Sequence, residues 1–193
     1  MDITKQKKQI DRVKKFACSE LTASRYKHSI LVAETSKDLS KRFKADLSKS
    51  YLAGIGHDIA REYSSKKVLK LAEQFGINCD ELQKKHPVSL LHGPVGSKIL
   101  QHKKLIDDEQ ILGAIYYHTT GTPQFDVLGK ILCVADYIEP SRSYDGVKKL
   151  RKLAQIDLDK CLYHCLLGSY NHLVSQGFKP HPLLMKTLSK LKY

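Results

Sequence analysis

The chain has no uninterrupted run of about 18 apolar residues, the length that a membrane-spanning helix requires. Its opening residues, Met1-Asp2-Ile3-Thr4-Lys5, also lack the apolar stretch of a secretory signal. We therefore expect a protein without a membrane span and without a secretory leader.

A disulfide framework is also missing. The five cysteines are odd in number and form no Cys-x-x-Cys pair. This usage indicates reduced thiols and predicts a cytoplasmic protein. Cys161 and Cys165 are four residues apart and would share one helix face, where packing is favoured over metal binding.

The sequence contains no convincing β-strand pattern, internal repeat, low-complexity tract or Gly/Ser linker. Apolar residues recur instead at helical spacing, and residues that favour helix N-caps precede many of these segments. We therefore predict an all-α fold in which residues 1–193 form a single domain, a helical bundle. The main expected helices cover 3–17, 24–43, 68–75, 89–100, 111–117, 127–138 and 157–175, with short helices near 80–85 and 145–153.

Three aspartates are predicted to cap helices, namely Asp46, Asp107 and Asp126. The helix after Asp46 is expected to run through Ile55 into His57-Asp58. Gly54 and Gly56 inside this helix are unfavourable by about 1 kcal/mol each relative to alanine. We expect them to allow a neighbouring helix to approach closely.

Positive charge exceeds negative charge by 13 at neutral pH. Such an excess attracts polyanions such as nucleic acid, nucleotides or an anionic membrane surface. The alternative is a solvated lysine surface, because the lysines are spread over many helices without interleaved aromatic residues. No module for reading bases is recognisable.

The pair His57-Asp58 interrupts the apolar segment 52–61. Adjacent helical residues point about 100° apart, but both can reach an ion that lies between their directions. Imidazole and carboxylate together suit iron, manganese or zinc. The pair predicts a metal site only if further ligands lie at compatible positions.

Such ligands are present along the chain. His28, His92 and His118 each lie near a helix end or in an otherwise apolar segment, where an unpaired polar ring would be costly to bury. Asp136 lies in the apolar segment 133–138 and needs a cation or several donors, or else caps another helix. We expect the histidines at 86, 102, 164 and 172 to be structural or surface residues.

Three arginines are within six positions of a proposed ligand: Arg25, Arg61 and Arg142. Each could form a surface ion pair, but their common placement favours bidentate contacts with phosphate oxygens. Arg61 would share a helix face with Asp58. The loop His118-Thr119-Thr120-Gly121 offers hydroxyls and a permissive backbone for phosphate or ribose.

Taken together and in order, these motifs resemble those of a known enzyme superfamily. The segments Arg25-Tyr26-Lys27-His28-Ser29, His57-Asp58-Ile59-Ala60-Arg61, His118-Thr119-Thr120-Gly121 and 135–142, with His92 between them, resemble the YqeK-type branch of the HD-domain phosphohydrolase superfamily. The likeness covers roughly residues 20–180. It implies an HD-type helical bundle, with a core at about 20–142 and C-terminal helices within 145–193 packing on it.

The resemblance also implies an activity, the symmetrical hydrolysis of diadenosine tetraphosphate to two ADP. It implies iron, or another divalent metal, held by His28, His57, Asp58 and Asp136, and a possible second ion at His92 and His118. A metal suits this chemistry because it lowers the pKa of a bound water. The implied catalytic residues are Asp58, His92, His118 and Arg61. The implied nucleotide contacts are Arg25, His28, Asp58, Arg61, His92, His118, Thr119, Asp136, Arg142 and the tail residues Phe178, Lys179, Pro180 and His181.

Other readings stay open. Guanosine tetraphosphate hydrolases of the superfamily usually carry Glu-Asp shortly after His-Asp, whereas Arg61-Glu62-Tyr63 follows here, and the Gly-Tyr-Pro element of cyclic dinucleotide phosphodiesterases is missing. A phosphohydrolase acting on another nucleotide, such as a deoxynucleotide, stays possible. A non-enzymatic RNA- or ribosome-binding protein with a structural metal is the alternative from a different class. A homodimer is also compatible with the sequence.

Overall fold

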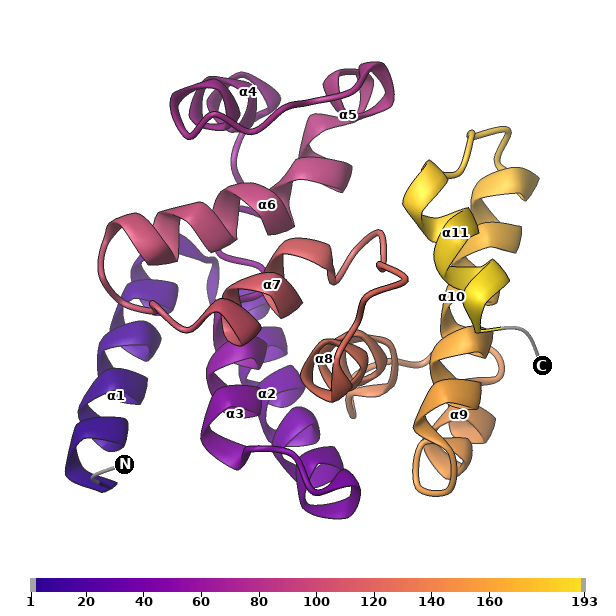
Figure 1. The fold of residues 1–193 in the computed structure, drawn as a ribbon, viewed down its shortest axis with the longest axis horizontal. Helices are drawn as coiled ribbons and strands as arrows, with labels where there is room; N and C mark the ends of the chain where they lie inside the picture. Colours follow the sequence, from indigo (N-terminus) through magenta and orange to yellow (C-terminus); the bar gives the residue numbers. More distant parts are fainter. Residues whose placement is uncertain (1–2, 192–193) are drawn as a thin grey trace.

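The computed structural model describes residues 3–191, and within this range the chain forms eleven α-helices and no β-strand (Figure 1). The all-α prediction is confirmed. The helices are α1 (Ile3–Glu20), α2 (Ala23–Phe43), α3 (Leu47–Gly56), α4 (Ser65–Gln74), α5 (Glu81–Lys85), α6 (Pro87–His102), α7 (Glu109–Tyr117), α8 (Val127–Ile138), α9 (Val147–Leu153), α10 (Leu158–Ser175) and α11 (Pro182–Lys190).

Helix starts follow local capping chemistry. The carboxylates of Asp46 and Asp126 accept hydrogen bonds from the backbone amides of Lys49 and Gly129, as predicted. The predicted cap of α7 at Asp107 is wrong by one residue. Asp108 is the N-cap, and its carboxylate accepts from the amides of residues 110 and 111 at 3.0 and 3.2 Å.

The predicted helix through His57-Asp58 is also wrong, because α3 ends at Gly56. Residues 57–62 continue as tight turns, in which the Arg61 amide donates to the Asp58 carbonyl at 2.8 Å. The His57 ring lies 2.7 Å from the Gly54 carbonyl through Nδ1 and competes for the acceptor that a continuing helix would use. The site pair therefore lies in a turn just beyond the helix.

The predicted close approach at the glycines of α3 is confirmed. A Cβ atom on Gly54 would lie 2.4 Å from the Ala33 Cα of α2, so only glycine fits. A Cβ on Gly56 would lie 2.9 Å from the Leu100 side chain of α6. These contacts bring α2 and α6 against the segment that carries His57 and Asp58.

Helix α8 lies near the middle of the molecule, between the N-terminal helices and the group α9 to α11 (Figure 1). It contacts α2, α3 and α7 on one side and α9 and α10 on the other. The division into a core at 20–142 and packing helices at 145–193 stays a prediction. Across residues 3–191, none of the helices combines the length and apolar character needed to cross a bilayer.

Candidate metal and phosphate-binding site

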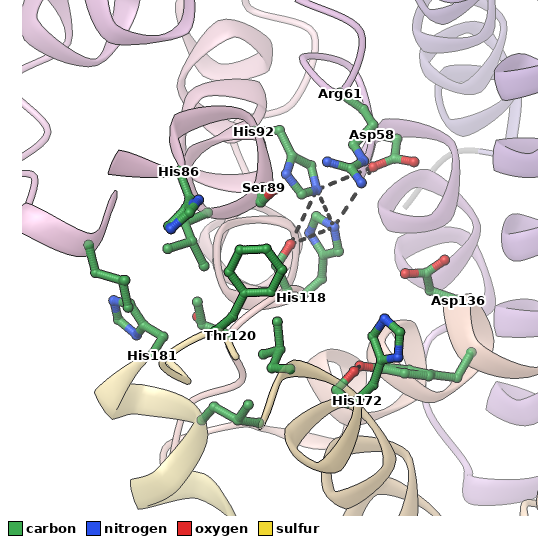
Figure 2. A pocket seen from close by; sticks show the side chains of 18 of the residues that line it. Asp58, Arg61, His86, Ser89, His92, His118, Thr120, Asp136, His172 and His181 are labelled. Carbon is green, nitrogen blue, oxygen red and sulfur yellow. Dashed lines mark hydrogen bonds and ion pairs between the residues drawn. The ribbon is translucent and has the colours of Figure 1, made fainter. Parts of the chain in front are cut away.

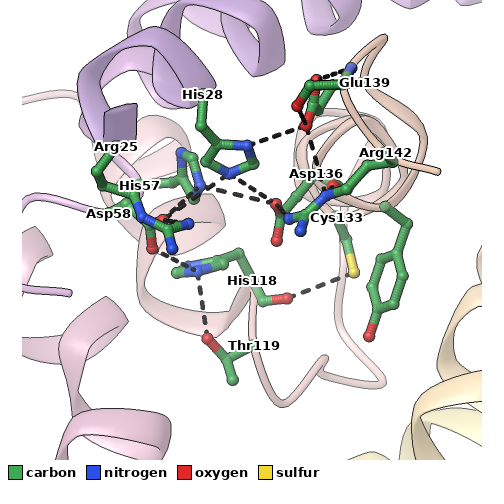
Figure 3. A network of polar contacts seen from close by, with 12 residues as sticks. Arg25, His28, His57, Asp58, His118, Thr119, Cys133, Asp136, Glu139 and Arg142 are labelled. Carbon is green, nitrogen blue, oxygen red and sulfur yellow. Dashed lines mark hydrogen bonds and ion pairs between the residues drawn. The ribbon is translucent and has the colours of Figure 1, made fainter. Parts of the chain in front are cut away.

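Four predicted ligands project toward one another from α2, α8 and the turn after α3 (Figure 3). The His28 Nε2 atom lies 3.1 Å from Asp136 Oδ1 and 3.8 Å from Asp58 Oδ2. The His57 Nε2 atom lies 3.4 Å from Asp58 Oδ2 and 3.9 Å from Asp136 Oδ1. Two imidazoles and two carboxylates therefore converge on one point.

The second carboxylate oxygen of Asp58 faces a different pair of histidines. Asp58 Oδ1 lies 3.3 Å from His92 Nε2 and 4.0 Å from His118 Nε2. These two ring nitrogens are 3.1 Å from each other. Asp58 thus stands between two histidine pairs, with one oxygen toward each.

Each of the four histidine rings is oriented by an oxygen atom that lies close to its Nδ1 atom. His57, His92 and His118 lie 2.7 Å from the carbonyls of Gly54, Val88 and Ile115. His28 Nδ1 lies 3.2 Å from the Glu139 carboxylate. Since each of these oxygens accepts a hydrogen bond from Nδ1, the Nε2 atom of each ring in its neutral form presents a lone pair to the centre.

This arrangement leaves lone pairs facing one another. The Nε2 atoms of His28 and His57 are buried without a hydrogen-bond partner, although the carboxylate of Asp136 lies next to His28. Two ligands held about 2.1 Å from one ion lie about 3 Å apart, close to the spacing seen here. Within residues 3–191, the sets His28-His57-Asp136 and His57-Asp58-His118 each place their ligand atoms within 4.8 Å of one another. The donor set therefore fits a divalent metal.

The charges within the cluster shift its titrations. Burial opposes protonation of His57, but the Asp58 carboxylate outweighs this effect and raises the pKa of His57 to about 9. Burial alone would raise the pKa of Asp58. The neighbouring His57 and His92 outweigh burial and hold this pKa well below its usual range. Burial and the neighbouring His92 lower the pKa of His118 to about 3. The centre thus keeps Asp58 ionised and His118 neutral, the forms that bind metal, whereas His57 must release a proton before its Nε2 can bind an ion.

The cluster opens into a pocket of about 410 Å³ (Figure 2). Three arginines line it. Arg25 donates to Asp58 Oδ2 at 3.1 Å, and Arg142 donates to Asp136 Oδ1 at 2.6 Å and to the Asp136 carbonyl at 2.8 Å. The Arg61 guanidinium has no hydrogen-bond or ion-pair partner among the described residues. The pocket combines a carboxylate-histidine floor with cationic walls.

Most of the predicted nucleotide contacts line this pocket, but two do not. His28 lies behind the pocket and lines a neighbouring cleft, because Glu139 and Asp136 hold its ring between them. Pro180 is not on the pocket wall, although its neighbours are. The predicted residues on the wall are Arg25, Asp58, Arg61, His92, His118, Thr119, Asp136, Arg142, Phe178, Lys179 and His181.

The tail residue His181 has a structural part as well. Its Nδ1 atom accepts the Leu183 amide at 3.2 Å and so caps α11, and its Nε2 atom lies 3.0 Å from the Asp80 carboxylate. The segment expected as a tail therefore starts a helix, and His181 ties that helix to the start of α5. Phe178 and Lys179 directly precede this cap and line the pocket.

Three polar residues of the site were not among the predicted site residues. His86 and His172, expected to be structural or surface residues, both line the pocket. His86 is the N-cap of α6 and meets the Phe178 ring edge to face at 5.6 Å. Glu139 is 1% exposed and holds His28. The sequence feature that could have indicated Glu139 is its position as a carboxylate directly after the apolar helix that contains Asp136.

Tyr137 lines the pocket and makes a short hydroxyl contact with Ser169 of α10. The two cysteines at 161 and 165 are buried in α10 and belong to neither ligand set found in residues 3–191. Their packing agrees with the interpretation favoured from sequence.

The fold and the site together define an HD-domain protein. The HD domain family model matches residues 25–141. A solved structure from Clostridium acetobutylicum, described as a predicted HD superfamily hydrolase involved in NAD metabolism, superposes with a TM-score of 0.90 at 32% identity and covers 94% of this chain and 95% of that one.

Two curated relatives narrow the group. The symmetrical bis(5'-nucleosyl)-tetraphosphatase of Staphylococcus aureus is 39% identical over 186 residues, which is 95% of this chain and 93% of that protein. The enzyme of the same name from Bacillus subtilis is 38% identical and covers 87% of this chain and 90% of its own length. The chain belongs to the family of symmetrical bis(5'-nucleosyl)-tetraphosphatases within the HD-domain superfamily.

Proposed function

We propose that the protein hydrolyses dinucleoside tetraphosphates, with diadenosine tetraphosphate as substrate, at the central phosphoanhydride bond. The products are two ADP. The observation that carries the proposal is the position of Asp58, between two histidine pairs and at the floor of a pocket with three arginines on its walls. The names of the relatives support the same substrate class.

The chain's own ligands for the metal are His28, His57, Asp58 and Asp136, and we propose iron as the ion. His92 and His118 offer, with Asp58, a second position. When bound, a metal at such a site lowers the pKa of a water and withdraws electron density from a phosphoryl oxygen. The orphaned Nε2 atoms of His28 and His57 support this assignment.

The arginines supply fixed positive charge for the polyphosphate. Arg25 and Arg142 are already held by Asp58 and Asp136, so their guanidinium groups need little reordering when substrate enters. Arg61 has no such partner and is free to contact a phosphate with its full guanidinium group. The three together stabilise negative charge that develops on the transferred phosphoryl group and on the leaving diphosphate.

The reaction consumes one water. Its oxygen forms the new bond to one of the two inner phosphorus atoms, and the central P–O–P bond breaks toward the other half. When a single ion is bound, His92 Nε2 can hold the proton that the water loses, since it lies 3.3 Å from the ionised Asp58 Oδ1. The Thr119 hydroxyl lies 3.2 Å from Nε2 of both His92 and His118 and can hold a phosphate oxygen beside them.

The remaining pocket wall suits a nucleoside. Phe178 and His86 form an edge-to-face pair there, and Leu90 and Leu173 add apolar surface. An aromatic pair beside aliphatic side chains can stack a purine base. Lys179 and His181 contribute polar groups at the same end of the pocket.

The test is product identification. The purified protein, loaded with a single divalent metal at a time, is incubated with diadenosine tetraphosphate, and the nucleotides are separated. We expect ADP as the sole nucleotide product. ATP with AMP, or no turnover with any metal, would overturn the proposal, and a panel that includes deoxynucleotides would then identify another phosphate substrate.

Asp58→Ala should abolish turnover and metal binding together, because its carboxylate serves both histidine pairs. Metal content and ADP release measured on the same preparation check this. Turnover retained in the variant would remove Asp58 from the mechanism. Binding to long RNA without nucleotide turnover would instead favour the RNA- or ribosome-binding alternative, which stays a prediction, as do a homodimer and a cytoplasmic location.

A further inference from the structure

A symmetrical cut places equal halves of the substrate on opposite sides of the reacting phosphorus. The pocket at Asp58 has about 410 Å³, which is near the lower end of the range of about 300–1,000 Å³ for a site that holds one small ligand. It therefore suits one nucleoside diphosphate half. The other half needs a second surface that begins at the same metal ligands.

A second cleft begins there. It has about 520 Å³ and is lined by residues that include Lys27, His28 and Tyr144. Arg25 and Arg142 line both this cleft and the pocket, and each is fixed to a carboxylate of the metal site. Figure 3 shows these two arginines on either side of the ligand cluster. A phosphate chain that passes between them would leave the pocket and enter the cleft.

The cleft is cationic. Besides the two shared arginines it contains Lys27, whose ammonium group has no ion-pair partner among the described residues. Within residues 3–191, the one carboxylate on its wall is that of Glu139, which is 1% exposed, lies 3.2 Å from the His28 ring and accepts the Ser141 amide at 2.7 Å. The field at the cleft therefore attracts phosphate.

An exposed aromatic ring stands at the edge of the cleft. Tyr144 is 42% exposed, and its hydroxyl donates to the Tyr137 carbonyl at 2.9 Å. This hydrogen bond fixes the ring while leaving part of it open to solvent. A fixed, exposed aromatic ring is a platform on which any base can stack.

We infer that this cleft binds the second nucleoside diphosphate half of the substrate, with Tyr144 stacked on its base and Lys27 on its phosphates. The inference rests on the proposed function and adds to it the position of the distal half. Tyr144 and Lys27 would then contact dinucleoside substrates. A single nucleotide bound in the pocket would not need these two contacts.

The test compares two ligands that differ only in the distal nucleoside. The KM of diadenosine tetraphosphate is measured together with the Ki of adenosine 5'-tetraphosphate as a competitive inhibitor, in the metal-loaded full chain. For Tyr144→Ala we expect the KM to rise by about fivefold or more, the loss of one stacked base, and the Ki to stay unchanged. Tyr144→Leu, which keeps apolar bulk without the aromatic ring, should behave in the same way.

Met185→Ala is the matched control, because Met185 is also 42% exposed and lines neither cleft nor pocket. It should leave both constants unchanged. An unchanged KM in both Tyr144 variants, or an equal rise in KM and Ki, would overturn the inference. A wild-type protein that does not cleave diadenosine tetraphosphate would instead overturn the proposed function, so the two failures are distinguishable.

Discussion

The two histidine pairs around Asp58 differ in what surrounds them. His28 and His57 share their side of Asp58 with a second carboxylate, that of Asp136, and neither histidine lines the pocket. Among the described residues, His92 and His118 have Asp58 as their one carboxylate partner, and both line the pocket beside Thr119. We call the first pair with its two carboxylates the enclosed half, because neither of its rings lines the pocket, and the second pair the open half, because both of its rings do.

This difference separates two tasks. Two imidazoles and two carboxylates suffice to hold one divalent ion without help from substrate. The open half offers two imidazoles and one shared oxygen, so an ion or a proton there would exchange readily and would respond to what enters the pocket. We expect the enclosed half to govern metal retention and the open half to govern turnover.

The largest effect should come from removing one ligand of each half. Asp136→Ala should lose both the firmly bound metal and turnover, because it removes one of the two carboxylates of the enclosed half. His118→Ala should keep one tightly bound metal per chain and lose most turnover. Metal content after gel filtration and the rate of ADP release are measured for both variants and compared. Equal metal loss in the two variants would break the distinction between the halves.

The helix contacts under each half provide a second comparison. Gly54→Ala would drive a Cβ against Ala33 of α2 and should destabilise the fold by about 1–3 kcal/mol while moving His28 away from His57. Gly93→Ala would place a Cβ 2.8 Å from the Ile115 carbonyl, next to His118, and should disturb the open half.

Thermal unfolding and metal content separate these outcomes, with Gly113→Ala as the control because a Cβ there meets nothing within 4 Å. Metal retention should fall in the Gly54 variant and survive in the Gly93 variant. If the Gly93 variant were the one to lose its metal, the assignment of the two halves would be reversed.

A smaller effect is expected from the carboxylate behind His28. Glu139→Ala removes the oxygen that orients the His28 ring and should weaken metal binding by about 10- to 100-fold. Glu139→Gln keeps an acceptor for the ring and should lose less. Metal affinity from competition with a chelator measures both, and identical affinity in wild type and Glu139→Ala would show that Glu139 does not position His28.

The smallest effect concerns the stability of α7, the helix that leads to His118. Asp108→Ala should cost about 1 kcal/mol of unfolding free energy, because the N-cap is lost, while Asp107→Ala should cost almost nothing. Burial alone would raise the pKa of Asp108. The hydrogen bonds from Lys49 and from backbone amides outweigh burial and lower this pKa. Its contribution is therefore present at neutral pH and is lost as the pH falls through the lowered value.

Denaturant unfolding at pH 7 and at pH 3 checks this last prediction, since the difference between wild type and Asp108→Ala should shrink at the lower pH. An equal loss in the Asp107 variant would contradict the assignment of the cap.

Much of the fold follows from local chemistry. Caps at Asp46 and Asp126, the glycine contact at Gly54 and the helical spacing of apolar residues are properties of short segments, and sequence reasoning predicted them. The choice between Asp107 and Asp108 failed because two adjacent carboxylates can each cap, and the backbone conformation decides between them.

The site was harder to predict beyond its ligands. The distinctive order of histidines and aspartates indicates which residues meet, and the structure brings His28, His57, Asp58, His92, His118 and Asp136 together. His86 and His172 reach the pocket only because α6 and α10 face each other across it, a tertiary arrangement without a local signal. Where α3 ends, the ring of His57 contacts the Gly54 carbonyl, a side-chain contact that helical spacing alone does not predict.

The central claim is that Asp58 joins two histidine pairs into one metal centre at the floor of a phosphate pocket. Crystals grown with Mn²⁺ and measured near the manganese absorption edge test it directly. The account predicts an anomalous peak within bonding distance of Asp58 and enclosed by His28, His57 and Asp136. No anomalous peak in contact with Asp58, in crystals of a preparation that hydrolyses diadenosine tetraphosphate with Mn²⁺, would contradict it.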